Sequence, residues 1–458
     1  MVCYFHYVIS CPREQKEIMH TDVNESQTIQ KKEVFGWAMY DFANSSYTTV
    51  VITYIYSAFF ISTIIPKESA LQDTYWSIAI AISTLLSVIL APILGSMADI
   101  NGKKKKYLFF LTIVSVTFTA SLFFVEPGQV WLGITLLVFS NTAWMLSENF
   151  IASFLPDIST PKNIGKISGI GWGIGYIGGL FSLIVMIGLI TANATEDPEL
   201  YIEQNQLAML VVALFYLLAA IPTFIFLKDR SVVNASKTQK SFADLLQASS
   251  KKVSNMLALI KEYPTLFRFF IPFTMYSAGI SVIVKFFGIY ASEELNITGS
   301  FLIITGAILQ LSSMLGAIAF GLLQDRAGAK LTLQASLLWW LLGLLAIYYL
   351  ENISLFFAVE IKEMFIIIAF IAGSALGATQ SASRAVVGLI TKKEDASLSY
   401  GLWGVFGKLA IVIGMTFGPI SDAVGRHDAL LVVMLYFFIG LLLLKLVPFA
   451  TLPNQPRR

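Results

Sequence analysis

Apolar runs of about 20 residues recur along the sequence from residue 37 to residue 447. A helix of that length crosses a hydrocarbon core of about 30 Å, so each run is a candidate membrane span. The 458 residues are 56% hydrophobic and only 13% charged, which is more apolar surface than a soluble fold of this length buries. The sequence therefore predicts an all-α integral membrane protein that crosses the membrane many times.

The predicted spans fall into two sets of six, separated by a polar, lysine-rich segment. They are expected near residues 37–61, 75–98, 107–125, 131–155, 167–190 and 206–227, and then near 266–290, 301–322, 331–350, 364–383, 400–424 and 429–447. The chain accordingly divides into a tail (1–34), a six-helix bundle (35–227), a linker (228–264), a second six-helix bundle (265–447) and a second tail (448–458). We expect a monomer.

Lysine and arginine residues gather in alternate loops, as they do on the cytoplasmic side of membrane proteins. The lysine run 103–106 and the linker belong to one side, whereas the opposite loops hold acidic residues such as Glu196, Glu199 and Glu293. Both termini are therefore predicted to be cytoplasmic. The short loops favour a bacterial inner membrane, with a vacuolar or lysosomal membrane as the alternative.

Several other classes of protein are not indicated. A formal net charge of +2 gives no sign of nucleic-acid binding. The two cysteines, Cys3 and Cys11, lie in the polar leader, so the sequence predicts neither a thiolate metal site nor a redox centre. The spans carry no HExxH, GxSG or GxGD pattern, and no GxxxxGK[ST] phosphate loop occurs. We expect neither an enzyme nor a bound cofactor or metal.

One loop pattern follows both the second and the eighth predicted span. Residues 95–106 read GSMADINGKKKK and residues 321–330 read GLLQDRAGAK, so a G-x3-D-x2-G skeleton recurs at equivalent places. Glycines let helix ends approach closely, and the carboxylate can accept from free N–H groups at a helix start. The lysines alone would also serve as an orientation signal. The pattern gives a candidate conformational latch: Gly95, Asp99, Gly102, Lys103, Gly321, Asp325, Arg326 and Gly328.

This repeated loop resembles the signature loop of the major facilitator superfamily. The resemblance implies twelve helices in two pseudo-symmetric bundles with a substrate path between them. Residues 37–53 (WAMYDFANSSYTTVVIT), 175–179 (GYIGG) and 379–408 (TQSASRAVVGLITKKEDASLSYGLWGVFGK) further resemble the vacuole amino-acid effluxer-like branch. The resemblance spans nearly the whole chain and implies amino acids as cargo.

Polar residues inside the first span are candidates for the solute path. Asp41, Asn44 and Ser45 are spaced to share one helix face, and Tyr40 lies next to them in the chain. Polar side chains are costly in lipid, so they usually meet a partner or a wet cavity. Asp41 is expected to bind a solute ammonium group or to exchange a proton, and an interhelical hydrogen bond is the structural alternative.

Lys408, well inside the eleventh predicted span, is the strongest candidate in the second half. A buried ammonium group there suits a solute carboxylate, or a structural ion pair with an acidic side chain. Gln380 and Arg384 lie one turn apart in the tenth span, and the planar guanidinium group suits a carboxylate. Gln310 in the eighth span completes the predicted substrate set.

The seventh span departs from the branch that the chain resembles. The resemblance implies an acidic residue in a Tyr-x-Asp-Gly block, whereas residues 276–279 read YSAG, with Ala278 at the acidic position. Lys285 follows seven positions later, on nearly the same helix face, so the local charge changes sign. Lys285 and Glu148 are both intramembrane residues to which the sequence assigns no partner.

A glycine-rich stretch, SGIGWGIGYIGGL at residues 168–180, matches the dinucleotide fingerprint GxGxxG at residues 173–178. That fingerprint binds a nucleotide only between a strand and a helix, and here an apolar span simply continues. We predict a helix in which Gly171, Gly175 and Gly179 share one face and admit a neighbouring helix.

These features together predict a secondary active transporter that moves a small polar solute, such as an amino acid, by alternating access, with or without coupling to protons. The alternatives are a transporter of a sugar, nucleoside or drug, and a membrane receptor or scaffold that keeps the fold without transport. The expected partners are the solute and the lipid bilayer.

Overall fold

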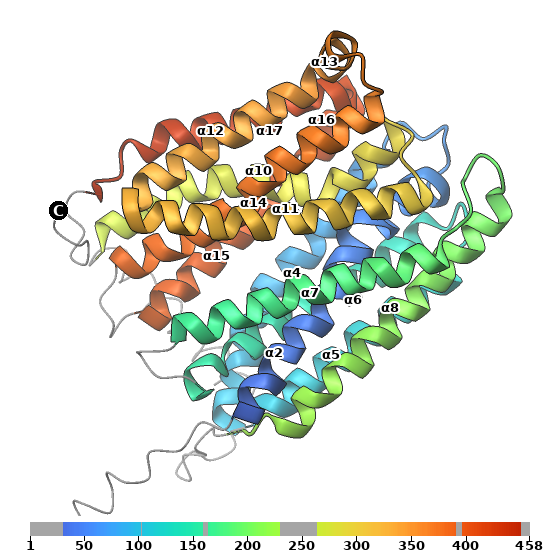
Figure 1. Cartoon of the computed structure of the whole chain (residues 1–458). Helices are drawn as coiled ribbons and strands as arrows, with labels where there is room; N and C mark the ends of the chain where they lie inside the picture. Colours follow the sequence, from blue (N-terminus) through green and yellow to red (C-terminus); the bar gives the residue numbers. More distant parts are fainter. Residues whose placement is uncertain (1–30, 102, 159–163, 230–262, 391–395, 450–458) are drawn as a thin grey trace, which may run out of the picture.

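A computed structural model describes residues 31–101, 103–158, 164–229, 263–390 and 396–449. Within these ranges, 12 helical segments are long and apolar enough to cross a membrane, which confirms the predicted fold class. The two sets of six lie as two neighbouring bundles, coloured blue to green and yellow to red in Figure 1.

The elements of the first half are α2 (Lys31–Ser46), η1 (Tyr47–Tyr54), α3 (Tyr56–Phe59), η2 (Phe60–Ile64), α4 (Gln72–Asn101), α5 (Lys104–Ser121), η3 (Leu122–Phe124), α6 (Val130–Ala152), η4 (Leu155–Ile158), α7 (Ile164–Leu189) and α8 (Pro198–Phe226). Those of the second half are α10 (Pro264–Glu293), α11 (Gly299–Ala327), α12 (Ala329–Tyr348), α13 (Leu350–Phe357), α14 (Ile361–Ile390), α15 (Ala396–Gly414), α16 (Phe417–Val424) and α17 (Arg426–Leu444).

The helices of the two halves have equivalent neighbours. In the first half α2 contacts α7 and α8, α4 contacts α6, and α5 contacts α8; in the second half α10 contacts α15 and α17, α11 contacts α14, and α12 contacts α17. Between the halves, α7 contacts α11, α4 contacts α15 and α16, and η1 contacts α10. The contacts therefore repeat in the way that two pseudo-symmetric bundles require.

The helices have two common ends, which we name by their residues. The near end is where α2 begins at Lys31 and α17 ends at Leu444, and the far end holds the loops at residues 65–71 and 294–298. Lysines 31, 32, 103–106, 228, 330 and 445 all lie at the near end.

The first span is not one regular α-helix, because η1 and η2 are π-helical turns separated by the short α3. The η1 sequence, YTTVVITY, is mostly β-branched, and such side chains crowd a regular α-helical turn. The Thr53 hydroxyl donates to the carbonyl oxygen of Thr48, five residues back, at 2.9 Å. π-helical turns inside longer helices often mark functional sites, and this one lies against α10 of the other half.

The eleventh predicted span, expected as one helix over residues 400–424, is divided into α15 and α16. Pro419 has no backbone N–H to donate to the previous turn, so it is tolerated in the first turn of a new helix and not inside a continuous one. The break lets α16 pack on the start of α4, so closely that a Cβ on Gly418 would overlap the Ser77 side chain.

The glycine-rich stretch lies entirely inside α7, with no preceding strand, so it does not form a dinucleotide loop. The predicted face of α7 does pack on α2: a Cβ at Gly171 would lie 2.5 Å from Asp41 Oδ2, and one at Gly175 would lie 3.0 Å from Ser45 Oγ. A Cβ at Gly179 would meet Thr49 Oγ1 at 2.8 Å and the amide group of Gln310 from the other half.

Replacing Gly178 with alanine is expected to lower the melting temperature of the purified protein by several degrees. A Cβ there would overlap the backbone of Phe42, including its carbonyl oxygen, and overpacking costs about 1–3 kcal/mol. Gly173→Ala in the same helix is the matched control, since its Cβ meets nothing within 4 Å. Equal melting temperatures for the two variants would contradict the close approach of α7 and α2.

Part of the candidate latch can be located at the near end. Gly95 lies in the last turns of α4, Lys103 directly precedes α5, and Gly328 links α11 to α12 with a φ of 84°, a left-handed conformation that favours glycine. The remaining latch positions fall outside what the structure describes, either as whole residues or in their side chains: Gly102, Asp99, Gly321, Asp325 and Arg326. The latch therefore stays a prediction.

Candidate functional site

A cavity of about 2390 Å³ lies between the two halves. Residues from α2, α4, α6 and α7 line it on one side, and residues from α10, α11, α14, α15 and α17 line it on the other. It extends to the near end, where Lys104 and Asp157 form an ion pair of 3.5 Å at its edge and are partly exposed. Its volume exceeds that of a typical small-molecule pocket, about 300–1,000 Å³, so a small organic solute would fit with water beside it.

The polar face of α2 lines the cavity with Asp41, Asn44 and Ser45, three of the predicted substrate residues. The Asn44 side-chain amide donates to Glu148 Oε1 on α6, and the Trp144 indole N–H donates to the Asn44 carbonyl oxygen at 3.3 Å. Glu148 thus has the partner that the sequence did not assign. These contacts hold the polar face of α2 toward the cavity.

Tyr40 does not join this group, contrary to expectation. Its side chain is fully buried inside the first bundle, where its hydroxyl forms hydrogen bonds with Thr112 Oγ1 at 2.7 Å and with the Tyr216 hydroxyl at 3.0 Å. One residue along an α-helix is a rotation of about 100°, so Tyr40 points away from the face that carries Asp41. Through these hydrogen bonds Tyr40 links α2 to α5 and α8, which is a structural role.

The second half contributes the other predicted residues, Gln310, Gln380, Arg384 and Lys408, which all line the cavity. They come from α11, α14 and α15, so the fold gathers residues from three helices that are far apart in the sequence. Their role in binding a solute stays a prediction.

Apart from the Lys104–Asp157 ion pair at the near-end edge, the charged residues on the two walls of the cavity are opposite in sign. Asp41 and Glu148 belong to the first half, and Arg384 and Lys408 belong to the second. Arg384 interacts electrostatically with Asp41, and Lys408 with Glu148. Since these interactions attract the halves to each other, a solute or proton that neutralises one of the groups would change that attraction.

At the far end, polar contacts between the halves close the cavity. The Arg426 guanidinium group donates to both carboxylate oxygens of Asp73 at 3.0–3.1 Å, and the Ser421 hydroxyl donates to the same carboxylate at 2.6 Å. In return, Asp422 accepts from the backbone N–H groups of Asp73 and Thr74 at 3.0 and 2.7 Å. We call Asp73, Ser421, Asp422 and Arg426 the far-end gate.

The gate residues do not stand out in the sequence. Asp73 and Arg426 are 353 positions apart, and each sits where an apolar span begins, a common place for a charged residue. The contact between α4 and α16, which follows the helix break at Pro419, brings them together. The sequence offers one weak signal for the gate, namely a charged residue at the start of a span.

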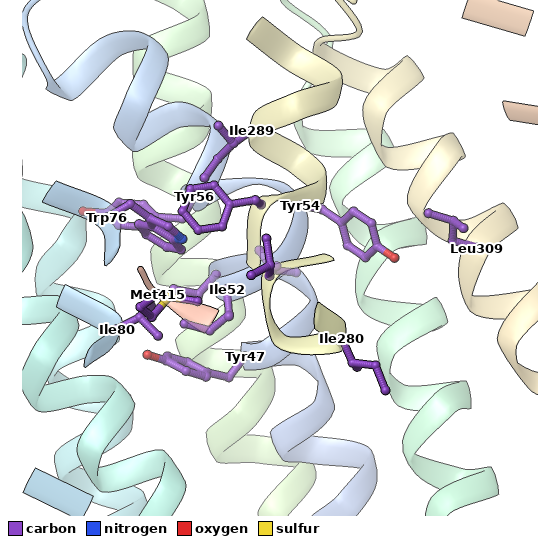
Figure 2. Close-up of a cluster of buried hydrophobic side chains, with 14 of the residues drawn as sticks. Tyr47, Ile52, Tyr54, Tyr56, Trp76, Ile80, Ile280, Ile289, Leu309 and Met415 are labelled. Atoms are coloured by element: carbon purple, nitrogen blue, oxygen red, sulfur yellow. The ribbon is translucent and has the colours of Figure 1, made fainter. Parts of the chain in front are cut away.

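Beneath the gate, apolar side chains from both halves pack together, as Figure 2 shows. Tyr56 from the first span lies beside Trp76 from α4, while Ile289 comes from α10 and Met415 from the break between α15 and α16. The Trp76 indole N–H donates to the backbone carbonyl oxygen of Lys285 at 3.0 Å and so ties α4 to α10. The far end is thereby sealed by an apolar layer and by the polar gate.

Aromatic side chains also line the cavity. Trp172 and Tyr176 of α7 both lie at the cavity, with ring centroids 6.1 Å apart. Trp403 and Phe406 line it from α15. The site therefore combines a few charged groups with apolar walls, as small-molecule sites do.

Known proteins of similar structure are transporters. The solved structure of a bacterial homolog of the human lysosomal transporter Spinster, in an inward-facing and occupied conformation, matches with a TM-score of 0.68 and 12% identity over 98% of this chain and 99% of that chain. The xylose transporter XylE of E. coli, in a partially occluded inward-open conformation, matches with a TM-score of 0.65 and 10% identity over 93% and 98%. At these identities the likeness shows the fold. Two equivalent six-helix halves around a central cavity define a membrane transporter of the major facilitator type, and not an enzyme.

The sequence relatives narrow the class further. The MFS-type transporter YxiO of Bacillus subtilis strain 168 is 28% identical over 423 residues, which cover 91% of this chain and 95% of YxiO. Autophagy-related protein 22-1 of Aspergillus fumigatus is 23% identical over 296 residues, which cover 62% and 48%. Residues 72–165 and 159–451 match the family described as "Vacuole effluxer Atg22 like", and the chain belongs to this family.

Proposed function

We propose that the protein is a secondary active transporter that carries a small polar solute through the central cavity by alternating access. The observation that carries this proposal is a cavity with oppositely charged walls, closed at the far end by contacts between the halves. If the far-end gate opened while the near-end helices came together, the same cavity would face the other side of the membrane.

The proposed orientation places the near end, with both termini, in the cytoplasm of a bacterial cell. The lysines at the near end support it through the positive-inside rule. One chain supplies both walls of the cavity, which supports a monomeric transporter.

The test is a ligand screen by thermal shift on the purified protein, followed by uptake into proteoliposomes. A bound solute raises the melting temperature in proportion to the logarithm of its concentration over Kd, so amino acids, sugars and nucleosides can be ranked. Accumulation of the best solute inside the vesicles is the expected result. If solutes bind but none enters the vesicles, the receptor or scaffold alternative replaces the transporter.

Asp41→Asn is expected to remove the stimulation of uptake by an imposed pH gradient. Asp41 lies at the cavity and interacts with Arg384 of the other half, and an amide cannot exchange a proton at working pH. Asp428→Asn is the matched control, because Asp428 is exposed on α17. Wild-type uptake that ignores the gradient, or an Asp41→Asn variant that still responds to it, would exclude Asp41 as the coupling residue.

A further inference from the structure

Lys285 is a buried basic residue of α10, with an exposed fraction of 7%. It lines the central cavity, and its backbone carbonyl oxygen accepts a hydrogen bond from the Trp76 indole N–H. Among the residues that the structure describes, its ammonium group has neither a hydrogen-bond partner nor an ion-pair partner. Basic side chains at membrane depth are usually paired, so an unpaired one is a functional candidate.

The carboxylates deep in the cavity interact with other bases. Arg384 interacts electrostatically with Asp41, and Lys408 with Glu148. Among the described residues of this part of the cavity, Lys285 is the basic group without an acidic partner. It belongs to the second half, like Arg384 and Lys408. The cavity therefore attracts anions toward the second half.

Aromatic rings form the wall along the same helix. Tyr54 packs edge-on against Phe287 at 5.6 Å, Phe287 stacks on Phe365 at 5.6 Å, and Tyr290 lies 6.3 Å from Phe365. All four line the cavity. Such walls suit an apolar or aromatic body better than a fully hydrated one.

We propose that the transported solute is an organic anion with an apolar body, and that Lys285 binds its carboxylate. This inference rests on the proposed transport function and specifies its substrate class. Lys285 then acts as a specificity-determining residue: a carboxylate completes the missing ion pair, whereas a neutral analogue of the same shape leaves the ammonium group unpaired.

Two probes of nearly equal shape test the charge requirement, 3-phenylpropionate and its neutral amide, 3-phenylpropionamide. Binding to the full-length protein in lipid nanodiscs is measured by calorimetry. Hydrogen bonds to charged groups support a preference for the carboxylate of about tenfold or more. Equal affinity for the two probes, or no binding of 3-phenylpropionate, would overturn the proposal.

Variants of Lys285 locate the preference. Lys285→Met is expected to lose the preference for 3-phenylpropionate over its amide, and Lys285→Arg is expected to keep it. Lys362→Met removes an exposed lysine of α14 and should leave this preference unchanged. Lys285→Met is also expected to raise the melting temperature of the protein without probe, because it removes an unpaired buried charge. A preference that survives in Lys285→Met, or a lower melting temperature, contradicts the assignment.

Uptake of radiolabelled 3-phenylpropionate into proteoliposomes separates this inference from the function on which it rests. Binding that needs Lys285 without any uptake would contradict transport and leave the anion site in place. Uptake that Lys285→Met does not reduce would contradict the anion site and leave transport in place.

Discussion

Replacing Lys408 with methionine is expected to reduce solute uptake to the background rate while the protein still folds. Lys408 lines the cavity from α15 and interacts electrostatically with Glu148 of the other half, so the substitution removes the proposed charged contact with the solute and an attraction between the halves. A hydrogen bond to a charged group is worth about 1.5–3 kcal/mol, which corresponds to roughly a 10- to 150-fold change. Initial uptake rates in proteoliposomes with equal amounts of inserted protein measure the loss.

A double variant separates solute binding from a purely structural ion pair. If Lys408 only compensates Glu148, then Glu148→Gln combined with Lys408→Met leaves two neutral partners and should restore uptake. If Lys408 binds the solute, the double variant stays inactive. Lys445→Met, at the exposed end of α17, is the matched control and should transport normally. Unchanged uptake in the single Lys408 variant would remove this residue from the site.

The fold could be predicted from the sequence because the bilayer fixes the length of each span and requires every backbone polar group in it to be hydrogen-bonded. Backbone groups in lipid must bond within their own helix, so run length alone locates the spans. The irregular elements could not be predicted in this way. The π-helical turns of η1 depend on crowding among β-branched residues, which run length does not distinguish from other residues of a span. The break before α16 depends on the single residue Pro419.

The candidate site was only partly predictable for a related reason. Helical spacing places Asp41, Asn44 and Ser45 on one face and Tyr40 to the side of it, but it does not say that Tyr40 would meet Thr112 and Tyr216 inside the bundle. Contacts between residues of different helices depend on how the bundles dock, which no local pattern records. The far-end gate, and the fact that Lys285 has no partner among the described residues, are both of this kind.

Replacing Arg426 with glutamine is expected to open the far-end gate. Asp73 is 1% exposed, and without the guanidinium group it would lack its charged partner in the closed gate. Breaking a buried ion pair costs about 3–5 kcal/mol, which would favour the far-end-open conformation by roughly a hundredfold to a few thousandfold. In the open conformation water can solvate the carboxylate, so the cost falls on the closed conformation alone.

Spin labels on the two halves measure this shift. With Cys3 and Cys11 replaced by serine, labels at Glu68→Cys and Lys362→Cys report the far end, since both positions are exposed there on different halves. A rocking motion also brings the near ends together, so a second pair at Lys106 and Leu331, again exposed and on different halves, should shorten as the first lengthens. Lengthening at one end without shortening at the other would indicate local unfolding of the gate instead of alternating access.

The matched controls decide whether the ion pair itself is responsible. Arg268→Gln, at an exposed arginine near the start of α10, should leave both label distances unchanged. Adding Asp73→Asn to Arg426→Gln removes the carboxylate that has lost its charged partner. The side-chain amide oxygen introduced at position 73 can still accept a hydrogen bond from Ser421. The double variant should therefore close again in part, because the open conformation of the single variant is driven by an unpaired buried charge and not by lost packing. If the double variant stays as open as Arg426→Gln alone, the ion pair is not what keeps the far end closed.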